Sequence, residues 1–300
     1  MNQNQVTSPY RELPKIIFSF SQMLVIGAFV ALFLAAYLTF DSRLFAQRIE
    51  IYHRGILYLW LIGLFGALQL YFFSRRQPDA ARNLWGRISV FEEDNDVSYG
   101  VFLLIFTVVI ISGFFQFRFK VLQFALFLAA IYTLLHKAQV FTFTTERPSW
   151  QHPTTAGGII QGATALSCVT GMWAYPDSPL QPVFVWVLLV VLFLEILTIW
   201  SRFRFLSQTN IATHQTAMMM LGSHLTLFGV RTIFGIIMPF IYLLWVLFIA
   251  KLPLHPVILM VFIGELSERI LFFVTALPAS AYPTESVETP LKNEESKNGS

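Results

Sequence analysis

Charged residues are scarce in this sequence. Of its 300 residues only 12% are Asp, Glu, Lys or Arg, whereas 56% are hydrophobic. Soluble globular domains carry about 25% charged residues, so water is not the main solvent of this chain. The net charge is only +3, and the basic residues are spread over short loops rather than gathered in one stripe. This distribution argues against nucleic-acid binding.

Cysteine is nearly absent as well. The single cysteine, Cys168, lies in an apolar segment, so the sequence provides neither an internal disulfide nor a thiolate-ligated metal cluster. Six histidines occur, but no facing pair of the kind that ligates haem in membrane subunits is evident. P-loop, dinucleotide-binding and nucleophile-elbow motifs are also missing. We therefore expect no haem and no metal in this chain.

Long apolar runs are the main positive feature. About 20 consecutive apolar residues span a bilayer as a helix, and these runs are continuous rather than alternating, which excludes the pattern of barrel strands. We expect an all-α integral membrane protein, a bundle of about eight transmembrane helices within residues 1–279. The predicted spans lie near 14–39, 55–74, 99–116, 121–140, 157–175, 182–201, 224–250 and 254–277.

The two ends of the chain differ from the apolar middle. The first apolar run follows Arg11 and Lys15, but it is too long for a signal peptide, so we read it as a retained span. The tail, 280–300, is rich in Ser, Thr, Pro, Glu and Lys, and is predicted to be disordered. Loop charges leave the orientation in the membrane open, because the arginines between Arg75 and Arg87 oppose the other loops.

Few ionisable residues fall inside the predicted spans, and each is a functional candidate because a charge is costly in lipid. They are Glu195, Arg231, Glu265, Glu268 and Arg269. Glu265 and Arg269 are four residues apart and can pair along one helix. Glu195 is close enough to the end of its span to reach the interface. The alternatives are mutual neutralisation inside the bundle and direct binding of a ligand.

A second group of polar candidates lies around the long loop after the second span. Gln69 is followed by Arg75, Arg76 and Arg82, so a hydrogen-bonding amide stands beside positive charge, where a quinone carbonyl can dock. The alternative for Gln69 is a solvated helix end. Asp96 opens the third span, where the helix dipole alone favours an acid. As a proton acceptor it would need a raised pKa and a nearby oxygen.

Three short segments also occur in a particular order along the chain. They are Arg11-Glu12-Leu13-Pro14 before the first span, Arg147-Pro148-Ser149-Trp150 before the fifth, and Gly264-Glu265-Leu266-Ser267-Glu268-Arg269 in the last. Together with Arg231 they resemble, over about residues 10–277, the membrane anchor subunit of dimethyl sulfoxide reductase complexes. Members of that family are eight-helix proteins.

The resemblance implies a function. In that family the anchor sits in the bacterial inner membrane, holds no metal, and oxidises menaquinol in anaerobic respiration. It passes the electrons to a ferredoxin-like subunit with four 4Fe–4S clusters, which feeds a molybdopterin catalytic subunit. By resemblance Asp96 is the proton acceptor, and we expect the Pro148–Trp150 loop to touch the iron–sulfur partner. The residues expected to bind quinol are Gln69, Arg75, Arg76, Arg82, Arg231, Glu265 and Arg269.

The sequence departs from the family at one functional position. Where the family has a histidine implicated in quinol binding, this chain has Gln69, which can hydrogen-bond a quinol but cannot take its proton. Two other functions stay open. One is a small-solute secondary transporter, whose site would gather Glu195, Arg231 and Glu265 near the bilayer midplane. The other is the anchor of a polysulfide- or tetrathionate-type reductase.

Overall fold

All regular structure in the described part of the chain is helical, which confirms the expected all-α fold. The computed structural model describes residues 9–37, 45–74, 97–115, 120–143, 150, 152–176, 180–208, 211–249 and 252–275. The helices are α1 (Pro9–Tyr37), α2 (Phe45–Ser74), α4 (Val97–Phe114), α5 (Lys120–Phe143), α6 (Pro153–Ala174), α7 (Gln181–Gln208), α8 (Ile211–Leu221), α9 (Leu225–Gly229), the π-helix η3 (Val230–Ile237), α10 (Met238–Phe248) and α11 (His255–Val274).

Each of the eight predicted spans coincides with helical structure. The seventh comprises α9, η3 and α10, which follow one another without a break because the backbone stays in the right-handed helical region at Gly229 and Ile237. Helix α8 was not predicted, because His214, Gln215 and two threonines give it a polar appearance. Its Ala217 and Met220 pack in a small apolar cluster, and this burial stabilises the helix.

Among the described residues, five helices are long and apolar enough to cross a membrane, so the chain has the features of a multi-pass membrane protein. They are Leu13–Tyr37, Ile49–Gln69, Lys120–Phe143, Gln181–Leu206 and Leu225–Phe248. Helix α4 is shorter, α6 is rich in Gly and Thr, and α11 carries three charges. Many side chains of α6 and α11 are buried against protein, and helices that face protein can be more polar than helices that face lipid. These five helices do not by themselves establish the predicted number of about eight spans.

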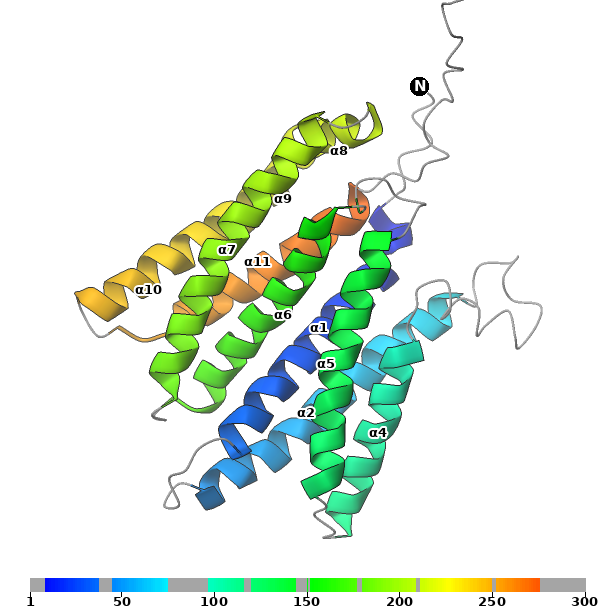
Figure 1. Cartoon of the computed structure of the whole chain (residues 1–300), viewed down its shortest axis with the longest axis vertical. Helices are drawn as coiled ribbons and strands as arrows, with labels where there is room; N and C mark the ends of the chain where they lie inside the picture. Colours follow the sequence, from blue (N-terminus) through cyan, green and yellow to red (C-terminus); the bar gives the residue numbers. More distant parts are fainter. Residues whose placement is uncertain are drawn as a thin grey trace, which may run out of the picture.

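Helix α1 is the centre of the bundle (Figure 1). It contacts α2 and α5 on one side and α6 and α11 on the other. A Cβ atom at Gly27 would lie 2.3 Å from the carbonyl oxygen of Ala163 in α6, so only glycine permits this crossing. Close approach through small residues is a common source of helix association in lipid, where apolar burial gives little driving force.

Two cores lie on either side of α1. The first joins α1, α2, α4 and α5 and is rich in aromatic rings, including Phe29, Tyr52, Phe102 and Phe106. The second joins α1 to α6, α7, η3, α10 and α11, and consists mainly of aliphatic side chains. The buried ionic side chains described next lie beside this second core.

Candidate functional site

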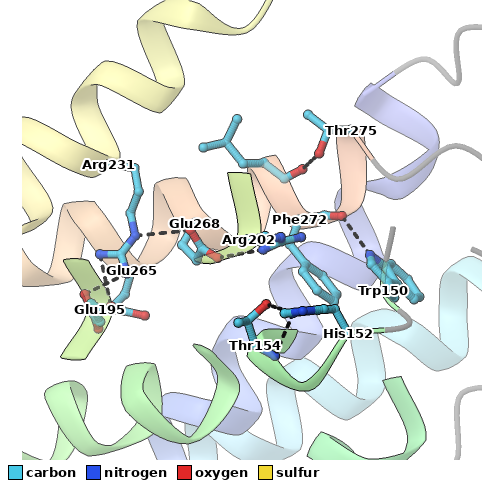
Figure 2. Close-up of polar contacts among 11 residues, drawn as sticks. Trp150, His152, Thr154, Glu195, Arg202, Arg231, Glu265, Glu268, Phe272 and Thr275 are labelled. Atoms are coloured by element: carbon cyan, nitrogen blue, oxygen red, sulfur yellow. Dashed lines mark hydrogen bonds and ion pairs between the residues drawn. The ribbon is translucent and has the colours of Figure 1, made fainter. Parts of the chain in front are cut away.

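Arg231 is the centre of a buried ionic cluster where α7, η3 and α11 meet (Figure 2). Its Nη2 donates to Glu195 Oε2 at 2.8 Å, and its Nε donates to Glu268 Oε2 at 3.2 Å. Its Nη1 lies 3.3 Å from Glu265 Oε1. The side chains of Glu195, Arg231 and Glu265 are each no more than 5% exposed. One guanidinium group therefore neutralises carboxylates from two other helices.

Two further arginines complete the cluster. Arg202 Nη1 lies 3.5 Å from Glu268 Oε1, and Arg269 is buried with its guanidinium 5.3 Å from the centre of the Phe272 ring. Three arginines thus accompany three glutamates, and the cluster is neutral when all six are ionised. An incomplete set would leave an uncompensated charge away from water, which is costly.

Glycines bring the helices of the cluster together. At the crossing of η3 and α11, a Cβ at Gly264 would lie 2.2 Å from the Cα of Gly235, so the two backbones touch. In α6, a Cβ at Gly162 would lie 2.3 Å from Glu265 Oε2. Glycine at these positions leaves the room that the carboxylate and the crossing need. The π-helix also places Arg231 on the side facing α7 and α11, and π-helical turns are frequent at functional sites.

A small cavity of about 30 Å³ lies beside the cluster. Its polar lining comes from α6, α7, η3 and α11, and consists of Thr154, Gln161, Glu195, Thr198, Arg202, Arg231 and Glu268. Glu195 Oε1, Gln161 Oε1 and Arg202 Nε have no hydrogen-bond partner in the described part of the protein. A polar cavity of this volume has room for one or two water molecules, but not for a metabolite.

Thr154 lines this cavity at the start of α6, and His152 lies beside Thr154 (Figure 2). The backbone N–H of Thr154 donates to His152 Nδ1 at 3.2 Å, and Thr154 Oγ1 lies 2.6 Å from the same nitrogen. Partial burial lowers the pKa of His152, and the positive charge of Arg202 lowers it further. Both effects favour the neutral imidazole, and its Nδ1 accepts the backbone hydrogen bond.

A larger and mainly apolar groove of about 620 Å³ lies between α1, α2, α6 and α11. Arg54, Tyr58 and Trp173 line one part of it, and Leu24 and Phe262 line another. Phe262 precedes Glu265 by three residues on α11, which is about one helical turn. The groove therefore approaches the ionic cluster along α11, and its lining suits a lipid-soluble molecule.

The residues predicted to form the site lie in different parts of the structure. Arg231, Glu265 and Arg269 do lie in one cluster, but the Glu265–Arg269 ion pair is not formed, because Glu265 pairs with Arg231 from another helix. Glu195 does not reach the interface, since it is 2% exposed and held by Arg231. Gln69 is not in the cluster: α2 packs on α1 through Gly66 and Ser21, whereas α11 packs on α1 through Phe20 and Phe262.

Most of the other residues predicted to have a function lie outside the described part of the chain, and Trp150 is buried. Arg75, Arg76, Arg82 and Asp96 and the tail 280–300 lie outside the described residues. Trp150, expected to face a partner, is instead 5% exposed and stacks on Phe272 with ring centres 4.6 Å apart. Its Nε1 donates to the carbonyl of Phe272. The Trp150 indole therefore packs against the C-terminal end of α11.

Arg202 is the functional candidate that the sequence analysis missed. The predicted sixth span ends at residue 201, whereas helix α7 continues to Gln208. This extra length places Arg202 beside Glu268. No proline or glycine follows Trp200 until after the end of α7, and this lack of a helix breaker was the available signal.

Comparisons of the chain with known protein families, curated proteins and solved structures find no match. Within the described residues, no group of three or more His, Cys, Asp and Glu side chains is arranged to hold a metal ion. The features of the site that bear on its chemistry are the ionic cluster, the small cavity and the apolar groove.

Proposed function

We propose that the protein is the quinol-oxidising membrane anchor of an electron-transfer complex, and that the quinol binds in the apolar groove. The approach of this groove to a buried carboxylate network carries the proposal. A quinol has an apolar tail and a ring with two hydroxyl groups, so it needs an apolar channel that leads to proton acceptors. The groove offers the channel, and Glu265 lies one turn beyond its Phe262 end.

Oxidation of a quinol to a quinone releases two protons and two electrons. In this proposal the ring lies at the Leu24–Phe262 end of the groove, and Glu265, the nearest carboxylate on α11, accepts the two protons one after the other and passes each one on. The tail extends past Trp173 into lipid. Arg231 stabilises the ionised form of Glu265 before the proton arrives, because their nearest atoms are 3.3 Å apart.

In this proposal the two electrons pass to a second protein. The resemblance to dimethyl sulfoxide reductase anchors supports a ferredoxin-like subunit with four 4Fe–4S clusters as the acceptor and a molybdopterin subunit as the terminal enzyme. It also supports menaquinol as the substrate, about eight spans, and the bacterial inner membrane as the location. An anchor of a polysulfide- or tetrathionate-type reductase would share the same groove and differ in its partners.

The transporter alternative receives less support. Its expected residues, Glu195, Arg231 and Glu265, do meet, but they neutralise one another. The cavity beside them measures about 30 Å³, far below the few hundred Å³ of small-molecule sites. A solute would have to break the ion pairs and separate the helices in order to bind.

Two adjacent residues of α11 allow a matched test. Ile258 lines the groove, whereas Leu259 is 61% exposed on the outer face. In Ile258→Trp the larger indole blocks part of the groove beside Phe262, so we expect quinone content and menaquinol oxidation by the purified complex to fall at least about tenfold, equivalent to about 1.4 kcal/mol. Leu259→Trp should change neither. Equal quinone content in the two variants would contradict the proposal.

A further inference from the structure

The small cavity beside the ionic cluster combines three features that point to water. It lies among polar and charged side chains from four helices, and it has room for one or two water molecules. Glu195 lines it and is 2% exposed, yet its Oε1 has no hydrogen-bond partner among the described residues. A buried carboxylate oxygen without a partner is costly, and water in the cavity would satisfy it.

Glu195 differs from the other two glutamates of the cluster. Glu268 contacts both Arg231 and Arg202, and two guanidinium groups hold it as an anion. Both oxygens of Glu265 also lack a hydrogen-bond partner among the described residues, but Glu265 contacts Arg231 and does not line the cavity. Glu195 contacts Arg231 through one oxygen and leaves the other at the cavity. It is therefore the carboxylate placed to exchange a proton with cavity water.

The groups that face Glu195 can accommodate both of its charge states. Arg231 comes from η3, Glu265 and Glu268 from α11, and Arg202 from the same helix as Glu195; α6 contributes the neutral Gln161 to the cavity. When Glu195 is ionised the six charges balance. When it is protonated, Arg231 keeps its contacts with Glu265 and Glu268.

A hydrogen-bonded route leads from the cavity to the end of the bundle. Thr154 lines the cavity, and its Oγ1 lies 2.6 Å from His152 Nδ1. Because Nδ1 also accepts from the Thr154 backbone N–H, it carries no proton itself and the hydroxyl donates to it. The His152 ring is half-buried and packs on Phe205.

We propose that this cavity holds water and carries protons between Glu195 and the His152 end of the bundle. The proton leaves Glu195 Oε1 for the water, which passes a proton to Thr154 Oγ1. The hydroxyl gives its own proton to His152 Nδ1, and the imidazole releases a proton from Nε2. The ring then exchanges its Nδ1 proton for one at Nε2 through solvent, which restores the tautomer whose Nδ1 accepts from the Thr154 backbone N–H. The inference rests on the proposed function for the source of the protons, which Glu265 takes from quinol and passes to Glu195 on the same guanidinium. The water and the route do not depend on that function.

Infrared spectroscopy of the full chain in detergent, without quinol, tests the buried acid. On acidification we expect the carbonyl stretch of a protonated buried carboxyl group, with a shift in heavy water. Glu195→Gln should remove this band, whereas Glu50→Gln, which alters an exposed carboxylate paired with Arg54, should retain it. A band that persists in Glu195→Gln, or no band in the unmodified chain, would overturn the proposal.

The route has its own test, which does not depend on the stability of the Glu195 variant. Thr154→Val keeps the side-chain volume but removes the hydroxyl, so we expect deuterium exchange at the carboxyl to slow at least about tenfold. Thr164→Val is the control, because this α6 hydroxyl bonds to the carbonyl of Ile160 and does not line the cavity. Equal exchange rates in the two variants would exclude the route. Failure of the groove variant to lose quinone would leave these infrared results unchanged, so the two proposals can fail separately.

Discussion

The two sides of the bundle are held together by different interactions. On the α2–α4–α5 side, rings from separate helices pack on one another, as Phe29 does on Phe102 and Phe106 at centroid distances of 6.2 and 5.5 Å. On the α7–η3–α11 side, one arginine joins carboxylates from two other helices. Ring packing depends on volume and shape, whereas the ionic cluster depends on a complete set of charges. In the proposed function the first side serves as a scaffold and the second as the reactive part.

The largest effect is expected from Arg231→Met, which breaks the cluster at its centre. It leaves Glu195 and Glu265 buried without the cation that they contact, and removal of one partner from a buried ion pair costs about 3–5 kcal/mol. Unfolding by denaturant in detergent, followed by circular dichroism, measures the loss. Arg231→Lys keeps the charge but cannot reproduce three contacts, so its stability should lie between the two. Equal stability of Arg231→Met and the unmodified chain would mean that the cluster does not stabilise the fold.

A smaller effect is expected from Gly264→Ala. The added Cβ would lie 2.2 Å from the Cα of Gly235, so η3 and α11 must separate, and overpacking of this kind costs about 1–3 kcal/mol. Gly229→Ala, at the end of α9, is the control, because nothing lies within 4 Å of its added Cβ. The same unfolding assay compares them. If both alanine variants are equally stable, the close crossing is not required.

The aromatic side should tolerate a change of similar chemistry. Phe29→Leu keeps an apolar side chain at a fully buried position. We expect the free energy of unfolding to fall by less than about 1.5 kcal/mol, as for exchanges between apolar side chains of similar volume. Quinol oxidation by the complex should stay near its original rate, because Phe29 belongs to the first core rather than to the cluster. A loss as large as that of Arg231→Met would remove the distinction between the two sides.

The smallest effect concerns pH. The pKa of His152 is lowered in the folded chain by burial and by Arg202, so the unfolded chain binds more protons near the ordinary histidine pKa of about 6.5. Stability from this residue is therefore present above that pH and is lost as the pH falls through the folded pKa. His152→Asn keeps a helix-capping side chain and does not titrate. Thermal unfolding is measured between about pH 5 and 8. The melting temperature of the unmodified chain should fall more steeply on acidification than that of His152→Asn, and an equal dependence on pH in the two proteins would contradict this assignment.

The sequence predicts the positions of the helices well and their contacts poorly. Apolar runs locate the helices because lipid requires long uncharged segments, and breaks at polar loops separate them. Arg231, Glu265 and Arg269 could be singled out because charges inside spans are rare. Their partners could not be predicted, because the Arg231 contacts join helices that are distant in sequence. The roles of Gly162 and Gly235 likewise depend on which helices cross at those positions.

Photolabelling with an azido-naphthoquinone tests the central claim most directly, since it reports where a quinone sits in the full chain. After labelling in membranes and digestion, mass spectrometry locates the modified residues. The groove predicts labels on its lining residues in α1 and α11, such as Leu24, Ile258 and Phe262, and their loss in the presence of excess menaquinone. Labels confined to Gln69 and the arginines that follow it would contradict this account and return the quinol site to the far end of α2.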